Sequence, residues 1–173
     1  GYIHGKDMFN FAIPGIMGDG LKMAWEAGAD KLPVRIEQAA SVVGVEDLPG
    51  SVSNIFSQPN LLVNKFGKRF MNEDHMQNTT YLSNAVSHQK ERSGFSIVDS
   101  SIVRYYMKNG VDNVSLVRPD PDVSDFIEGV KMARENGNTG LVVADTIEEL
   151  AELAGIDVDN LVDTVDEYND YCD

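Results

Sequence analysis

The hydrophobic positions of this chain fall into two patterns: short continuous apolar runs, and longer stretches in which apolar residues recur every three or four positions. The first pattern predicts strands and the second predicts helices. The predicted helices span residues 21–27, 78–92, 101–108, 126–135, 147–154 and 158–171. The predicted strands span residues 32–43, 62–64, 68–70, 95–99 and 141–144, while residues 1–17 and 44–57 are predicted to be irregular. Strands and helices do not alternate strictly, which favours an α+β fold with a small mixed sheet, a β-hairpin and several packed helices.

Capping residues define the ends of several predicted helices. Asp19 is a suitable N-cap for the first helix, and Gly28 can adopt the left-handed conformation that ends it. Thr146 and Glu149 have the spacing of a capping box, in which the two side chains bind free backbone N–H groups at the helix start. Asp157 is expected to cap the last helix.

Residues 62–72, Leu-Val-Asn-Lys-Phe-Gly-Lys-Arg-Phe-Met-Asn, predict two strands joined by a tight turn. Gly67 is expected at the position of this turn that needs a positive φ. Glu73 and Asp74 follow directly, and we expect them to form surface ion pairs with the basic residues Lys68 and Arg69.

The composition is that of a folded protein, with 42% hydrophobic and 24% charged residues in a chain of 173, enough for one domain. No apolar stretch approaches the roughly 20 residues that cross a bilayer, so we expect no membrane insertion. Cys172 is the single cysteine, which excludes an internal disulfide, and His4 and His88 have no partner at ligand spacing. We therefore expect no metal site.

The net charge of −14 is unevenly distributed. Residues 1–92 carry 9 Lys and Arg against 10 Asp and Glu, whereas residues 93–173 carry 5 against 18. An acidic half of this kind repels phosphate groups, so a nucleic-acid partner is not expected. An anionic substrate would be attracted to the near-neutral first half.

Four segments resemble, in the same order, the flavoprotein family of fumarate reductase and succinate dehydrogenase, which are FAD-dependent oxidoreductases. They are Gly18–Gly20 with the following Met23, Ala24 and Gly28, the hairpin Val63–Glu73, the strand Ser96–Ser100, and Ala144–Ala151 with Gly155–Asp157 and Thr164–Asn169. The resemblance implies the fold of the family's capping domain, which closes over the substrate. Residues 1–40 would be a leading strip of the flavin domain and residues 41–173 the capping domain.

The family's Gly-x-Gly-x-x-Gly motif, which cradles the FAD pyrophosphate, does not occur in this sequence. The histidine and arginine that help to hold substrate in the family lie beyond its Tyr-Asn element, where this sequence stops. The resemblance therefore implies an excised piece of a larger flavoprotein, which would provide the FAD. We expect the piece alone to bind no cofactor and to be inactive.

The resemblance also implies site residues. The aspartate of the family's Gly-Asp-Gly turn contacts FAD, and here that turn is Gly18, Asp19 and Gly20, although Asp19 could equally be an ordinary helix cap. On an ungapped count, the family's substrate-binding histidine, threonine, glutamate and arginine and its proton-donating arginine fall on Ala40, Val52, Ser53, Phe56 and Gln77. None of these can act as the family's residue does. The substrate lining with Ala40, Ser53 and Phe56 thus implies a substrate other than fumarate.

Two nearby residues could replace the missing proton donor. His75 lies two residues before Gln77, and histidine is a natural general acid near neutral pH, although an exposed or capping histidine is the commoner case. Tyr81 could donate a phenolic proton or could simply be a packed aromatic residue.

Two functions follow as expectations. The first is the capping domain of an FAD-dependent reductase or dehydrogenase, which transfers hydride between flavin and an activated C=C bond of a small unsaturated substrate. The alternative is a non-catalytic binding or assembly module, whose acidic half docks onto a basic partner such as a cytochrome. Members of the family occur on both sides of bacterial membranes, so the compartment stays unassigned.

Overall fold

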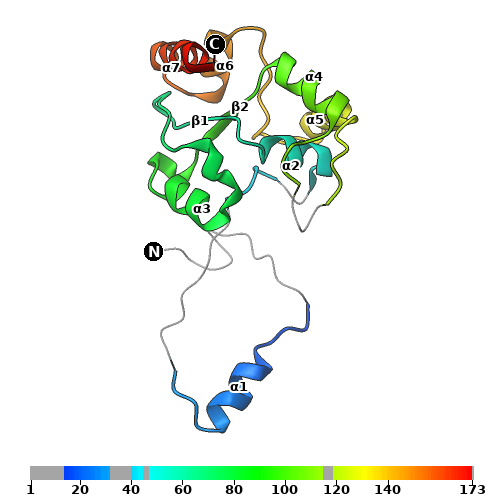
Figure 1. Ribbon diagram of the computed structural model, residues 1–173, viewed down its shortest axis with the longest axis vertical. Helices are drawn as coiled ribbons and strands as arrows, with labels where there is room; N and C mark the ends of the chain where they lie inside the picture. Colours follow the sequence, from blue (N-terminus) through cyan, green and yellow to red (C-terminus); the bar gives the residue numbers. More distant parts are fainter. Residues whose placement is uncertain (1–13, 32–39, 45–46, 115–118, 173) are drawn as a thin grey trace. The chain divides into compact units, whose positions relative to one another are not determined.

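The computed structural model describes residues 14–31, 40–44, 47–114 and 119–172 (Figure 1). The chain divides into two compact units, residues 1–36 and residues 37–173. Most of the strand predicted at residues 32–43 lies outside the described residues. Its described part, residues 40–43, is not in a strand.

The first unit contains helix α1 (Asp19–Glu26). Its N-cap is Gly18 at φ 75°, and Asp19 is the first helical residue, so the predicted cap was wrong by one position. The reason is that Gly18 can make the left-handed turn into the helix, which leaves the Asp19 carboxylate free to pair with Lys22 Nζ at 3.1 Å. Gly28, at φ 94°, ends the helix as predicted.

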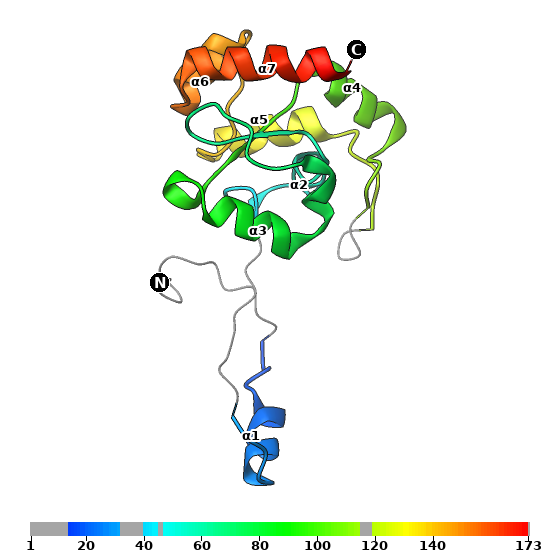
Figure 2. The ribbon, with the colours of Figure 1, turned by 60° about the vertical axis from the view of Figure 1, so that its left-hand side comes forward.

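The second unit combines helices with a two-stranded antiparallel sheet, which confirms a mixture of α and β structure. Its elements, in order, are α2 (Gly50–Phe56), β1 (Leu61–Val63), η2 (Glu73–Gln77), α3 (Thr79–Ser87), η3 (Lys90–Arg92), β2 (Phe95–Ile97), α4 (Ser100–Asn109), α5 (Phe126–Glu135), α6 (Ile147–Ala154) and α7 (Val158–Cys172). In Figures 1 and 2, α6 and α7 lie side by side at one end of this unit, and α3 lies at the other end.

The sheet differs from the predicted hairpin. β1 pairs with β2, in a register that joins Leu61 to Ile97 and Val63 to Phe95. The predicted strand 68–70 makes a single bridge, between Val63 and Arg69, because the chain then leaves β1 and enters η2. The apolar run 141–144 is not a strand either, because Leu141 is buried in the helical core instead of pairing with a strand edge.

Residues 44–57 were predicted to be irregular, but they include helix α2. Pro49, at φ −54°, occupies its N-cap, where proline fits because the missing N–H needs no partner. Val52 and Ile55 point inward and have no exposed surface, so burial stabilises a helix of only 7 residues.

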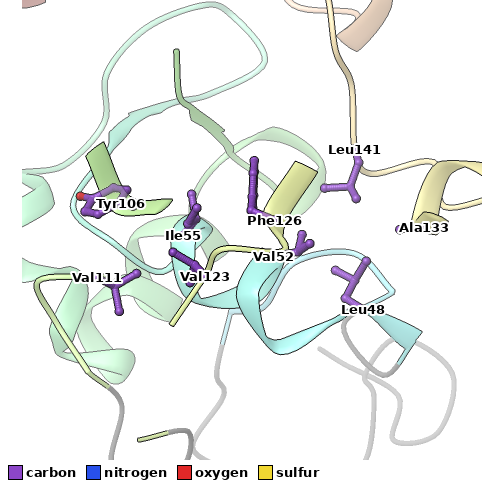
Figure 3. Close-up of a cluster of buried hydrophobic side chains, with 9 residues drawn as sticks. All are labelled: Leu48, Val52, Ile55, Tyr106, Val111, Val123, Phe126, Ala133 and Leu141. Carbon is purple, nitrogen blue, oxygen red and sulfur yellow. The ribbon is translucent and has the colours of Figure 1, made fainter. Parts of the chain in front are cut away.

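The main core lies among α2, α4 and α5 (Figure 3). Val52 and Ile55 of α2 gather there around Val123 and Phe126, with Tyr106 of α4 at the side. A second cluster joins the sheet to the C-terminal helices through Leu61, Val63, Ala151, Ile156 and Leu161. The C-terminal helices are thus held against β1 by apolar burial.

The C-terminal helix caps follow the prediction closely. Glu149 N–H donates to Thr146 Oγ1 at 3.1 Å, while the Glu149 carboxylate accepts from the N–H of Asp145 rather than that of Thr146. Gly155 ends α6 at φ 67°, and Asp157 Oδ1 accepts from Asn160 N–H at 3.0 Å to cap α7. These interactions are local, which is why the sequence predicts them well.

Candidate functional site

A tight turn follows β1 and is built around Asn64. Asn64 Oδ1 accepts hydrogen bonds from the backbone N–H groups of Phe66, at 3.0 Å, and Lys68, at 3.2 Å. The Asn64 N–H donates to the Lys68 carbonyl at 2.9 Å, and Gly67 takes φ 70°, as predicted. The Asn64 side chain also donates to Gln89 Oε1 at 3.1 Å, so this turn is tied to the chain that leaves α3.

The tip of this turn is held from two sides. On one side, a Cβ atom at Gly67 would lie 2.6 Å from the backbone nitrogen of Leu161, and Asp157 N–H donates to the Lys65 carbonyl at 3.3 Å. On the other side, Lys65 Nζ pairs with Glu91 Oε2 at 2.6 Å. The turn therefore bridges the N-terminal end of α7 and the loop before β2.

Arg69 and Glu73 fix the chain that follows. Arg69 Nε lies 2.9 Å from both carboxylate oxygens of Glu73, and Glu73 Oε1 also accepts from the Leu62 N–H at 3.1 Å. The hydrogen bond to Glu73 raises the pKa of Arg69 above its usual value. The pairing of these two residues was predicted, but its surface location was wrong, because only 3% of Glu73 is exposed.

This ion pair positions the short helix η2, which carries the candidate catalytic residues. Met76 of η2 points inward, while His75 and Gln77 are exposed. The His75 ring meets the edge of Tyr81 with centroids 5.3 Å apart, and 49% of Tyr81 is exposed. The structure thus places the His75 imidazole beside the Tyr81 phenol, and it leaves the Gln77 amide exposed in the same short helix.

The predicted substrate-lining residues lie on two different elements. Ala40 N–H donates to Ser83 Oγ of α3 at 2.9 Å, which joins residue 40 to the helix that follows η2. Ser53 is buried in α2, and the ring of Phe56 packs against Phe126 with centroids 5.9 Å apart. Among the described residues the structure therefore joins Ala40 to the helix after His75, and it keeps Ser53 and Phe56 in α2 beside the main core.

Two serine hydroxyls of α2 are buried without a hydrogen-bond partner among the described residues. They belong to Ser51 and Ser53, which are 6% and 5% exposed. A buried hydroxyl without a partner costs free energy, so each could accept a hydrogen bond from a bound molecule. Ser51 and Ser83 were not among the predicted site residues, because a small polar residue in an amphipathic run carries no chemical signature.

A shallow hollow of about 410 Å³ opens beside the ion pair and is lined by Arg69, Met71 and Asn72. The Arg69 guanidinium also lies over the ring of Tyr168, 5.5 Å from its centroid. Because Glu73 already holds this guanidinium at two points, Arg69 is better placed to stabilise the fold than to clamp a second carboxylate.

Other kinds of site find no support in the described part of the chain. No group of three His, Cys, Asp or Glu residues there is arranged to hold a metal ion. No helix there is both long enough and apolar enough to span a bilayer. The candidate residues Gly18, Asp19 and Gly20 lie at the start of α1 in the first unit.

Comparison with known proteins gives two matches. Residues 4–173 match the model of a family described as an FAD binding domain. The chain is also similar to the vinyl phenol reductase of Lactiplantibacillus plantarum, with 27% identity over 166 residues that cover 90% of this chain and 33% of the relative. The chain thus spans about a third of the length of that curated relative. No solved structure matches the chain significantly.

Proposed function

Because this chain belongs to the family of FAD binding domains, within the flavoprotein oxidoreductases, we propose that it is the substrate-capping part of an FAD-dependent reductase. The parent enzyme would transfer hydride between the flavin and an activated C=C bond. FAD supplies the hydride chemistry, and the capping part binds the substrate and excludes water from it.

One observation carries this proposal. The family match spans residues 4–173, yet the Gly-x-Gly-x-x-Gly motif that holds the FAD pyrophosphate does not occur among them. The matched curated relative is about three times as long as the matched region, which leaves room for a separate nucleotide-binding part. These facts support a segment that completes a flavin enzyme without cradling the cofactor itself.

The start of α1 fits one edge of a bound FAD. A Cβ atom at Gly18 or Gly20 would meet no atom within 4 Å, so the backbone there is open to close approach. The first N–H groups of a helix have no partner inside it, and the exposed Asp19 carboxylate can accept a hydrogen bond from a hydroxyl group. In the proposal, these residues contact FAD that the rest of the parent protein holds.

For the substrate we propose a neutral, aromatic alkene. On the ungapped count, Ala40 and Phe56 occupy the positions of two of the family's fumarate-binding residues, and neither can bind a carboxylate. The relative named vinyl phenol reductase is consistent with such a substrate. In the proposal, the half-buried ring of Phe56, which packs against Phe126, contacts the aromatic part of the substrate.

For the proton donor we propose His75. Its ring is exposed at the surface of η2, and the Arg69–Glu73 pair fixes the chain that leads into this helix. Gln77 would orient the substrate by hydrogen bonding, because an amide does not donate a proton as an acid.

The test uses the parent flavoprotein with its FAD reduced anaerobically and mixed with either 4-vinylphenol or fumarate. We expect 4-vinylphenol to reoxidise the flavin much faster than fumarate does. Replacing His75→Gln should slow that step at least tenfold, while the control His88→Gln should not, because the hydrogen bond that His88 makes within the described residues is to the Asn84 carbonyl of the adjoining helix turn. Faster reoxidation by fumarate would contradict the substrate class, and no reoxidation by either compound would favour a non-catalytic module.

A further inference from the structure

A second hollow, of about 310 Å³, lies between α4 and the C-terminal part of α7. It is lined by three tyrosines, Tyr105, Tyr106 and Tyr168, together with Pro59, Asn60 and Ile102. We refer to it as the tyrosine groove. Half of Tyr105 is exposed, so an aromatic face is open to a partner. Tyrosine is a residue type enriched in protein interfaces because it offers both apolar area and a hydroxyl.

A carboxylate lies at the edge of the tyrosine groove. The Tyr105 hydroxyl donates to Asp112 Oδ1 at 3.2 Å, and the Asp112 side chain is exposed. The groove therefore combines a tyrosine ring with an accessible negative charge. This is the pair of groups that binds a guanidinium, which stacks on the ring and forms hydrogen bonds to the carboxylate.

The same combination already binds a guanidinium at Tyr168, one of the three tyrosines that line the groove. Arg69 lies over the ring of Tyr168 at 5.5 Å and is held by the carboxylate of Glu73. Tyr105 and Asp112 offer an equivalent ring and carboxylate, with no arginine of the described residues recorded over that ring.

The charge around the tyrosine groove determines whether a positively or a negatively charged partner is favoured. Residues 145–172, which include α6 and α7, carry ten Asp and Glu and no Lys, Arg or His. The basic residues beside the groove tyrosines are Arg104 and Lys108 of α4 and Arg69 over Tyr168, and they are fewer than these ten carboxylates. The resulting field attracts cations and repels carboxylates and phosphates.

We propose that the tyrosine groove docks an arginine side chain of a separate basic protein, with Tyr105 stacking on the guanidinium and Asp112 pairing with it. This inference concerns residues other than His75 and Gln77 and does not depend on the proposed reaction. The chemistry of the partner follows from the groove, which combines an aromatic face with negative charge.

The test measures binding of a fluorescently labelled (Gly-Arg)₄ peptide to the 173-residue chain by fluorescence anisotropy at low ionic strength. Tyr105→Ala should weaken binding about fivefold because the stacking face is lost, whereas Tyr105→Phe should stay within about twofold because the ring remains. Tyr81→Ala is the matched control, since Tyr81 is as exposed as Tyr105, and it should not change the affinity.

Two further comparisons complete the test. Asp112→Asn should weaken binding more than Asp159→Asn, which removes an equally exposed carboxylate from α7. The same peptide with citrulline in place of arginine should not bind. The proposal is overturned if the arginine peptide does not bind, if Tyr105→Ala and Tyr81→Ala behave alike, or if the citrulline peptide binds equally well.

Discussion

The backbone of Gly67 lies so close to Leu161 that a Cβ atom on Gly67 would be 2.6 Å from the Leu161 nitrogen. Leu161 has no exposed surface and belongs to the core that joins α7 to β1. The turn at Gly67 is therefore a packing surface for the last helix. The Leu62–Asn72 segment, one of the four that resemble the flavoprotein family, therefore contributes to the stability of the fold.

We expect Gly67→Ala to lower the free energy of unfolding by about 3 kcal/mol, because alanine is strained at this φ and its Cβ would displace α7. Gly155→Ala is the control, since Gly155 has a similar φ of 67° and open space around it, and it should cost about 1 kcal/mol. Urea unfolding measures both variants. Equal losses would show that the contact with Leu161 contributes nothing.

Glu73→Gln should also destabilise the chain. The substitution removes the charge that Arg69 binds at two points, inside a site where Glu73 is almost fully buried, and a loss of about 2 kcal/mol is expected. The comparison is Glu91→Gln, which breaks the exposed pair with Lys65 and should leave the urea midpoint unchanged. If the urea midpoint of Glu73→Gln were as high as that of the unsubstituted chain, the buried ion pair would contribute nothing to stability.

The N-cap of α4 predicts a pH dependence. Partial burial of Asp99 opposes its ionisation, but hydrogen bonds from the Ile102 and Ser101 N–H groups and from the Ser101 hydroxyl lower its pKa below the usual value. Because the folded-state pKa is the lower one, the stabilisation is complete above the unfolded pKa of about 4 and is lost as the pH falls through the folded value.

We therefore expect Asp99→Ala to lose about 1 kcal/mol of stability at pH 7, and this deficit should shrink as the pH falls below about 4. Asp99→Asn keeps an oxygen that can accept the same N–H groups, so it should retain most of the stability at pH 7 and should vary less with pH. Unfolding curves between pH 2.5 and about 7 measure both. A deficit in Asp99→Ala that is constant over this range would argue against the carboxylate cap.

The hydrogen bond between Ala40 and Ser83 links residue 40 to α3. Ser83→Ala removes the acceptor, so we expect the Ala40 amide to exchange its hydrogen at least tenfold faster, at a stability cost of about 1 kcal/mol. Ser87→Ala is the control, because the Ser87 hydroxyl donates to the Asn84 carbonyl within the same helix and does not bond to Ala40. Unchanged exchange at Ala40 in Ser83→Ala would mean that this tether does not form in solution.

Several local features of the fold were predictable from the sequence, whereas the strand pairing was not. The caps at Thr146 and Asp157 and the positive φ of Gly67 depend on neighbouring residues, and all three are as expected. The pairing of β1 with Phe95–Ile97 joins residues 32 to 36 positions apart, which local patterns do not specify. The strand predicted at residues 141–144 was wrong because a short apolar run looks the same in the sequence whether it is buried against helices or in a sheet.

In the candidate site, too, a contact between nearby residues was predicted and the contacts between distant residues were not. The pairing of Arg69 with Glu73 followed from their four-residue separation, but the burial of Glu73 depends on the Leu62 N–H reaching its carboxylate. Likewise, Tyr105 and Tyr168 carry no shared sequence signal, and only the packing of α4 beside α7 brings them to one groove.

We propose that this chain covers a flavin which another part of the parent protein holds. The visible absorption spectrum of the purified 173-residue chain, recorded after incubation with excess FAD and desalting, tests this arrangement. We expect a colourless protein without the flavin band near 450 nm, and a yellow protein with FAD bound in a 1:1 ratio would overturn the proposal.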